Sequence, residues 1–327
     1  MNTLKPSGVI RIETQGPPTV LHYTSEQLGD PAVNEILISQ KAIAINFVDI
    51  LFRNGTFPLK QFPATIGGEA AGVVESVGAG ITGFKAGDRV AYYSSLGAYA
   101  ERRLIKADDL VRLPDDISYE QAASILAKGL TARMLVRQAY SVRPGDVVLI
   151  HAAAGGVGSL VSRWAKALGA TVIGSVGTAA KKTIALNSGA DYVIVSDSPD
   201  FAAEVNAFTM NKGIDAVYDG VGKATFETSI RLLKQGGTAV LYGSASGSPQ
   251  VDQAFFADRQ LQFVRPILGQ YLPGQHSRET AIRELFEAWR TGILGEIRPT
   301  IYPLADAARA HHDLESRNTT GSVILLP

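Results

Sequence analysis

The segment that most constrains this chain is an apolar run followed at once by a glycine-rich turn. The run is Val147-Val148-Leu149-Ile150, and residues 151–158 read His-Ala-Ala-Ala-Gly-Gly-Val-Gly. Glycines in such a turn let the backbone approach a pyrophosphate, and the N–H groups that open the next helix then face the negative charge. The strict G-x-G-x-x-G pattern is not met, because Ala153 holds its first position, but A-x-x-G-x-x-G fits residues 152–158. Because the turn follows a strand and opens a helix, it predicts a dinucleotide site rather than a purely structural turn.

Strand-like and helix-like segments alternate after this turn, which predicts a parallel sheet with helices on both faces. The expected strands are Val147–His151, Thr171–Ser175, Tyr192–Val195, Ile214–Asp219 and Thr238–Gly243. The expected helices are Gly158–Leu168, Ala179–Asn187, Phe201–Met210 and Ala224–Leu233, the last ended by Gly236-Gly237.

The first third of the chain has a different texture, with short β-branched runs broken by glycine and proline. These runs predict an antiparallel, barrel-like unit; they are Val9–Glu13, Glu35–Ala44, Gly72–Val77, Asp88–Ala91 and Tyr99–Ile105. A helix is expected over Tyr119–Val136, with Ser118 as its N-cap.

The strand-rich texture partly returns near the end of the chain. Helices are expected over Arg278–Arg290 and Asp306–Glu315, and a strand over Ser322–Leu326. The predicted fold class is α/β, with a doubly wound parallel-sheet domain of residues 126–268 inserted in a β-barrel domain of residues 1–125 and 269–327. A length of 327 residues agrees with two domains, since single cores stop growing near that size.

Composition excludes several classes of function. There is no cysteine, which rules out disulfides, thiolate catalysis and cysteine-ligated metals. Basic and acidic residues number 31 each, so the chain lacks the excess of positive charge that is typical of nucleic-acid-binding proteins. The first residues lack the apolar run of a signal peptide, and no stretch approaches the roughly 18 apolar residues of a membrane span. The expected location is the cytoplasm.

The residues after the second parallel strand predict which cofactor is bound. NAD-binding proteins carry an acidic residue there for the ribose hydroxyls. Residues 173–178 read Ile-Gly-Ser-Val-Gly-Thr without Asp or Glu, and Lys181 and Lys182 follow. Hydroxyls and an ammonium group can receive a 2′-phosphate, so NADPH is favoured. The alternative is that the two lysines belong to a solvated helix face.

Motifs spread over essentially the whole chain resemble the zinc-free quinone oxidoreductases, the zeta-crystallin-like group of the medium-chain dehydrogenase/reductase superfamily. The similarity rests on the order and number of these short segments. They are Ile45–Asp49, Gly68–Gly72, Lys85–Val90, Lys128–Thr131, the glycine turn, Tyr218-Asp219 and Leu314–Arg317.

The resemblance implies a GroES-like β-barrel catalytic domain, a Rossmann domain, and a cofactor in the cleft between them. It also implies a homodimer formed by edge strands of the Rossmann sheets, with Leu261–Arg265 as the edge. The cofactor-binding residues that it implies are Asn46, Phe47, Asp49, Lys128, Thr131, Gly156, Val157, Gly177, Thr178, Lys181, Ser196, Gly220, Gly243, Ser244, Val264, Arg265 and Arg317.

The chain departs from its relatives at three positions. Leu51 stands where an aromatic residue is frequent, Ser196 replaces a tyrosine near the adenine-side phosphate, and Met134 replaces another tyrosine. Zinc-dependent relatives use cysteine and a Gly-His-Glu segment as ligands, whereas this chain reads Gly67-Gly68-Glu69. Glu69 is therefore expected to be a hydrogen-bonded structural carboxylate, and no metal is expected.

The histidines offer no convincing alternative chemistry. His151 ends the strand that feeds the glycine turn, where a structural role is favoured over a cofactor contact. The adjacent His311 and His312 point to different faces of their expected helix and make a poor metal pair.

These observations together predict an NADPH-dependent reductase of a quinone or a related conjugated small molecule, passing a hydride or single electrons. Asn46 and Lys128 are the candidates for stabilising the developing anion. An enone or alkenal double-bond reductase is the nearest alternative. An RNA-binding role or a structural, crystallin-like role is disfavoured.

Overall fold

The chain folds into two compact units. The computed structural model describes residues 5–327, and its first unit comprises the described residues up to Ala127 together with Ile297–Pro327. The second unit comprises Lys128–Glu296. The chain therefore leaves the first unit, completes the second, and returns to the first.

The chain re-enters the first unit at Ile297, whereas the sequence predicts the boundary between residues 268 and 269. The reason is that α9 (Gly274–Arg290) packs onto α2 (Tyr119–Met134) and stays with the second unit. A Cβ atom on Gly129 would lie 2.3 Å from Leu285, so the two helices approach closely because residue 129 has no side chain. An ion pair of 2.6 Å between Arg133 Nε and Glu284 Oε2 joins the same helices.

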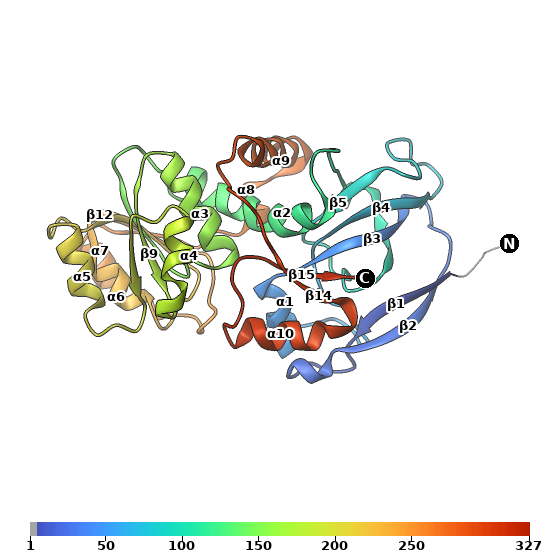
Figure 1. Ribbon diagram of the computed structural model, residues 1–327, viewed down its shortest axis with the longest axis horizontal. Helices are drawn as coiled ribbons and strands as arrows, with labels where there is room; N and C mark the ends of the chain where they lie inside the picture. The colour runs from blue at the N-terminus through green and yellow to red at the C-terminus, as the bar shows by residue number, and fades with distance from the viewer. Residues whose placement is uncertain (1–4) are drawn as a thin grey trace. The chain divides into compact units, whose positions relative to one another are not determined.

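The second unit is built on a six-stranded sheet in the order β10-β9-β8-β11-β12-β13, with every pairing parallel. This is the doubly wound order of dinucleotide-binding folds, which reverses direction between β8 and β11. Figure 1 shows α3 and α4 on one face of this sheet and α5, α6 and α7 on the other. The strands are β8 (Val147–Ile150), β9 (Thr171–Val176), β10 (Tyr192–Val195), β11 (Ile214–Asp219), β12 (Leu233–Leu241) and β13 (Gln262–Val264). The helices are α3 (Gly156–Ala167), α4 (Lys182–Asn187), α5 (Phe201–Phe208), α6 (Phe226–Arg231), α7 (Gln253–Asp258), α8 (Leu268–Tyr271) and α9.

Apolar side chains on one face of this sheet explain why α5, α6 and α7 cover it. Leu149 and Val217 from the strands are fully buried against Phe201 of α5, Phe226 of α6 and Phe256 of α7. The rings of Phe226 and Phe256 stack with centroids 6.4 Å apart. Burial of this kind, rather than helix propensity, holds such short helices in place.

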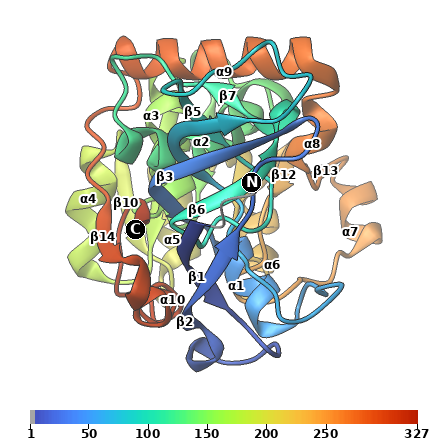
Figure 2. The same cartoon turned by 90° about the vertical axis from the view of Figure 1, so that its right-hand side faces the viewer.

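The first unit holds a seven-stranded sheet, and its pairings are antiparallel except for β14 with β15. The order is β14-β15-β3-β4-β5-β7, with β6 on β3, and β1 and β2 form a separate pair. Figure 2 shows β3, β5 and β6 facing the viewer. The strands are β1 (Lys5–Arg11), β2 (His22–Leu28), β3 (Glu35–Ile45), β4 (Ala70–Val77), β5 (Arg89–Tyr92), β6 (Arg102–Lys106), β7 (Val111–Arg112), β14 (Thr300–Pro303) and β15 (Val323–Leu326). Its helices are α1 (Phe47–Asn54), α10 (Ala307–Glu315) and the start of α2.

Helix α2 begins as the sequence predicts. The Ser118 hydroxyl accepts from the backbone N–H of Gln121 at 3.1 Å, and the Gln121 side chain accepts from the N–H of Ser118 at 2.8 Å. This reciprocal pair satisfies two N–H groups that have no partner inside the helix.

Several predicted helix boundaries differ from the structure by two to four residues, and for α6 the predicted helix overlaps the strand that follows it. The sequence places a helix over Ala224–Leu233, ended by Gly236-Gly237, but α6 ends at Arg231 and β12 begins at Leu233. The pairing of β11 with β12 shifts between Ile214 and Ala216, so the two glycines lie in an irregular stretch of strand. Gly236 has a φ of +75°, a conformation that favours glycine inside such a bulge as well as at a helix end.

Candidate functional site

The glycine turn after β8 leads directly into α3, as the sequence predicts. Ala152 adopts the left-handed conformation with φ 52°, and its carbonyl accepts from the N–H of Gly155 at 2.8 Å. A Cβ atom on Gly158 would lie 2.3 Å from that same carbonyl oxygen. Only glycine therefore fits at position 158, and it allows the first turn of α3 to pack against the preceding loop.

The first turn of α3 has the properties of an anion-binding site. Its N-cap is Gly155, and among residues 5–327 no side-chain cap is bonded to this end of the helix. Its first turn contains no acidic residue. The first N–H groups of a helix have no partner within the helix, and the helix dipole makes this end positive. Gly156 and Val157, predicted to hold a pyrophosphate, are the first two residues of this helix.

His151 has the structural role that the sequence favours. It is 1 % exposed, and its ring nitrogens lie 2.6 Å from Ser175 Oγ and 2.6 Å from Ser229 Oγ. The Ser229 hydroxyl donates to the Thr225 carbonyl at 2.7 Å and so accepts from His151 Nε2. Burial lowers the pKa of His151, which keeps the ring neutral.

The residues predicted around a 2′-phosphate gather at the ends of β9 and β10. Gly177 and Thr178 follow β9 and are exposed, and Lys181 ends the 3₁₀ turn Ala179–Lys181 before α4. The N–H of Ser196, after β10, donates to the Val176 carbonyl at 2.8 Å. The Ser196 hydroxyl lies 3.1 Å from Ser175 Oγ. Serine at this position therefore bonds inward to the end of β9.

The loops after β11 and β12 lie side by side. A Cβ atom on Gly243 would lie 2.6 Å from the Gly220 carbonyl oxygen, and the N–H of Gly243 donates to the Asp219 carbonyl at 3.3 Å. Ser244 follows in the same loop, and Val264 and Arg265 come at the end of β13. Because the carboxyl ends of parallel strands share one edge of the sheet, these loops and the glycine turn line a common border.

Asp219 shapes this border, although the sequence assigned it no specific role. Its side chain is fully buried and accepts from the N–H groups of Val221 and Gly222 at 2.8 and 2.9 Å, and from the Thr225 hydroxyl at 2.8 Å. A carboxylate with three donors fixes the path of the loop that contains Gly220. The available signal was an acidic residue that ends an otherwise apolar strand.

Two further predicted residues lie on α2. Lys128 is 6 % exposed and Thr131 is partly buried. Three residues apart, they lie on the same face of the helix. Met134, on the same helix, is 2 % exposed and belongs to the interior.

The first unit contributes Asn46, Phe47 and Asp49 at the start of α1. The backbone N–H of Asn46 donates to Asp49 Oδ2 at 2.8 Å, and the Asn46 side-chain amide donates to Glu69 Oε2 at 2.8 Å. Asp49 is fully buried, whereas Phe47 is 36 % exposed. Asp49 thus supports the helix start, while Asn46 and Phe47 lie at its accessible end.

Glu69 is the structural carboxylate that the sequence predicts. Besides the Asn46 amide, it accepts from the backbone N–H of Ala127 at 2.7 Å, and it is 1 % exposed. Within residues 5–327, no group of three or more histidine, aspartate or glutamate side chains lies close enough to hold a metal ion.

Arg317 follows α10 in the left-handed conformation, with φ 59°. Its N–H donates to the Leu314 carbonyl at 3.2 Å, which ends the helix. His311 and His312 do point to different faces of this helix, since the first is buried and the second exposed.

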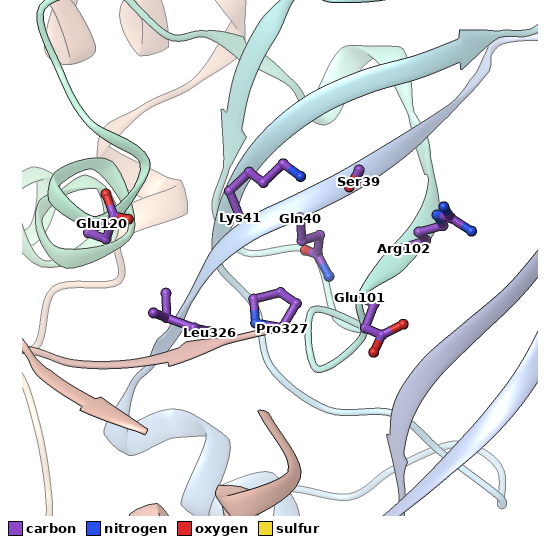
Figure 3. A pocket seen from close by; sticks show the side chains of 8 residues that line it. All are labelled: Ser39, Gln40, Lys41, Glu101, Arg102, Glu120, Leu326 and Pro327. Carbon is purple, nitrogen blue, oxygen red and sulfur yellow. The ribbon is translucent and has the colours of Figure 1, made fainter. Parts of the chain in front are cut away.

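A cavity of about 460 Å³ in the first unit contains none of the predicted site residues. Figure 3 shows its lining, which includes Lys41, Glu101, Arg102 and Glu120. Two of these charges are engaged by the fold, because Arg102 pairs with Glu75 at 2.8 Å and Glu101 accepts from the N–H of Gly8 at 2.8 Å. Over the described residues, no helix is long and apolar enough to cross a membrane.

Comparison with known proteins matches both units. A family model described as "Alcohol dehydrogenase GroES-like domain" matches residues 32–115, and one described as "Zinc-binding dehydrogenase" matches residues 156–287. A quinone oxidoreductase of Pseudomonas aeruginosa is 41 % identical, over 97 % of this chain and 99 % of its own length. A 2-haloacrylate reductase of a Burkholderia species is 38 % identical, over 97 % of this chain and 98 % of its own length.

Among solved structures, that of Escherichia coli quinone oxidoreductase complexed with NADPH aligns with a TM-score of 0.94 and 41 % identity. The alignment covers 98 % of this chain and 100 % of that one. A GroES-like unit joined to a doubly wound parallel-sheet unit defines the medium-chain dehydrogenase/reductase superfamily. Within it, the chain belongs to the quinone oxidoreductase family.

Proposed function

We propose that this protein is an NADPH-dependent reductase that transfers hydride from NADPH to a quinone. The observation that carries the proposal is the glycine turn with an uncapped α3, bordered by Thr178, Lys181 and Ser196 at the carboxyl ends of β9 and β10. Hydroxyl and ammonium groups can receive a 2′-phosphate, and residues 173–178 at the end of β9 contain no Asp or Glu. The relative solved with NADPH supports the same cofactor.

Residues of this chain would hold each part of the cofactor. Gly156 and Val157 would bind the pyrophosphate, Gly177, Thr178 and Lys181 the 2′-phosphate, and Asn46 would lie beside the nicotinamide. Bound NADPH supplies the hydride. Reduction of a quinone leaves a delocalised oxyanion, which the Asn46 amide or the Lys128 ammonium group would stabilise.

The cofactor assignment is tested by titration with NADPH and NADH. Lys181→Ala should weaken NADPH binding about 10- to 100-fold, the range for loss of a charge-assisted contact, and leave NADH binding unchanged. Lys212→Ala is the matched control, because this exposed lysine precedes β11 and so lies at the opposite edge of the sheet. Equal affinity of the parent for both cofactors would contradict the assignment.

A second candidate function is double-bond reduction of a conjugated acceptor, favoured by the relative that is a 2-haloacrylate reductase. The two functions are separated by steady-state kinetics with a benzoquinone and a 2-alkenal. A kcat/KM at least tenfold higher for the benzoquinone supports the first function, and the reverse ratio supports the second. A cytoplasmic location and a homodimer remain predictions.

A further inference from the structure

A continuous chain of buried polar groups in the first unit leads to Asn46. It begins at Arg53 of α1, which is 1 % exposed. The Arg53 guanidinium donates to both carboxylate oxygens of Glu315 on α10, at 2.7 and 2.8 Å, and to the Gly16 carbonyl at 3.1 Å. It also lies 3.4 Å from His311 Nδ1. Arg53 thus joins two helices that are far apart in the sequence.

The partners of His311 determine the direction of its hydrogen bonds. A guanidinium can only donate, so His311 Nδ1 accepts from Arg53 and the ring proton lies on Nε2. Nε2 is 2.7 Å from the Tyr99 hydroxyl oxygen, which therefore accepts. Tyr99 then uses its own proton to donate to Asp49 Oδ2 at 3.3 Å. Each group donates in the same direction, from Arg53 toward Asp49.

Burial keeps the two central groups uncharged. Burial, and then the charge of Arg53, lowers the pKa of His311 to about 3. Burial, and then the charge of Asp49, raises the pKa of Tyr99 well above its usual value. The imidazole and the phenol therefore act as fixed hydrogen-bond groups at neutral pH.

This series of hydrogen bonds ends at Asn46, the residue that would lie beside the nicotinamide. Asp49 Oδ2, which accepts from Tyr99, also accepts the backbone N–H of Asn46. The Asn46 side chain is fixed separately, because a carboxylate can only accept and Glu69 therefore selects the NH₂ group of its amide. The backbone and the amide of Asn46 are thus each set by a buried carboxylate.

We propose that Tyr99 and His311 are positioning residues, which set Asn46 for the nicotinamide end of the cofactor by orienting Asp49. The proposal rests on the proposed function. A residue that contacts a reacting group must keep its position to within about half an ångström. Buried hydrogen bonds behind that residue usually hold it there. Apolar side chains between α1 and α10 would hold the two helices together equally well. They would not provide a series of hydrogen bonds that runs in one direction and ends at Asn46.

The test compares two ligands, of which only one contains the nicotinamide half of the cofactor. NADPH carries the nicotinamide, whereas adenosine 2′,5′-bisphosphate carries only the adenine end and the 2′-phosphate. Tyr99→Phe removes one hydroxyl and keeps the shape of the ring. We expect it to weaken NADPH binding about fivefold and lower kcat about tenfold, and to leave binding of the bisphosphate unchanged.

Tyr92→Phe is the matched control, because Tyr92 is a fully buried tyrosine of the same core whose hydroxyl bonds to Gln40 and lies outside the chain. Tyr92→Phe should lower stability about as much as Tyr99→Phe does, without changing the ratio of the affinities for NADPH and for the bisphosphate. His311→Gln keeps a donor and an acceptor and should retain most activity, whereas His311→Leu should behave as Tyr99→Phe does.

The outcomes separate the two proposals. Failure of the parent to bind NADPH would overturn both the proposed function and this inference. Tight NADPH binding by the parent, with equal changes for both ligands in Tyr99→Phe or changes no larger than in Tyr92→Phe, would overturn the positioning role alone.

Discussion

The role of each glycine in the turn after β8 depends on which atoms surround it. At Gly158 the neighbour is a backbone carbonyl oxygen, which cannot rotate away as a side chain can. Gly269 in α8, in contrast, has no heavy atom within 4 Å of its ideal Cβ position apart from its chain neighbours and the backbone of its own helix. Two glycines that look alike in the sequence are therefore expected to differ sharply in their tolerance of a methyl group.

Gly158→Ala should lower the free energy of unfolding by about 1–3 kcal/mol, because the Ala152 carbonyl must move to accept the new methyl group. The movement displaces the turn, so NADPH affinity should fall as well. Urea unfolding and cofactor titration measure the two effects, with Gly269→Ala as the control. A Gly158→Ala variant with parental stability would show that the turn relaxes at little cost.

Local sequence predicted the residues of the turn but not the chain that supports Asn46. The turn could be found because its strand, glycines and helix are contiguous from Val147 onward. Arg53 and His311 are separated by 258 positions, and no spacing rule connects them. Only the spacing of His311 and Glu315, four residues apart on one helix face, gave a local hint.

At the scale of elements, two parallel strands have the predicted bounds, Tyr192–Val195 and Ile214–Asp219. A third does not, because a strand was expected over Thr238–Gly243 and β12 spans Leu233–Leu241. The bounds of α6 were wrong because glycines at a helix end and in a bulge produce the same local signal.

Strand β13 lies at the edge of the second unit's sheet, as the resemblance implies for Leu261–Arg265. An exposed edge strand can pair with a second copy of the chain. We therefore predict a homodimer by light scattering, and a shift to monomer in the double variant Gln262→Lys, Ile267→Lys. Ile301→Lys, on edge strand β14 of the other sheet, should leave the dimer intact. A parent that is monomeric at micromolar concentration would refute the prediction.

The stability of the whole molecule should depend on pH through its two buried histidines. Burial lowers the pKa of both His151 and His311 in the folded chain. Below about pH 6.5 the unfolded chain binds protons that the folded chain does not, so stability falls as pH falls. His311, whose pKa burial lowers to about 3, should contribute a loss of about 1.4 kcal/mol at pH 5.5 and none well above pH 6.5, and His151 should contribute a loss in the same direction.

Urea unfolding at pH 7.5 and 5.5 measures this dependence. In His311→Gln, the difference in unfolding free energy between the two pH values should shrink by about 1.4 kcal/mol, because one of the two buried histidines is gone. An unchanged difference would mean that His311 titrates normally in the folded chain.

The return of the chain to its first unit has a consequence for synthesis on the ribosome. Val323 and Leu325 of β15 pair with Ile45 and Ile43 of β3, whereas β6 pairs with Glu35–Ser39 on the same side of that strand. The Ile43–Ile45 end of this side of β3 therefore has no partner until residues 323–325 emerge. Every strand of the parallel sheet has by then been made. The inserted unit can therefore finish folding while the flanking one still exposes the unpaired end of β3, and a nascent chain stalled near residue 300 would be prone to aggregate.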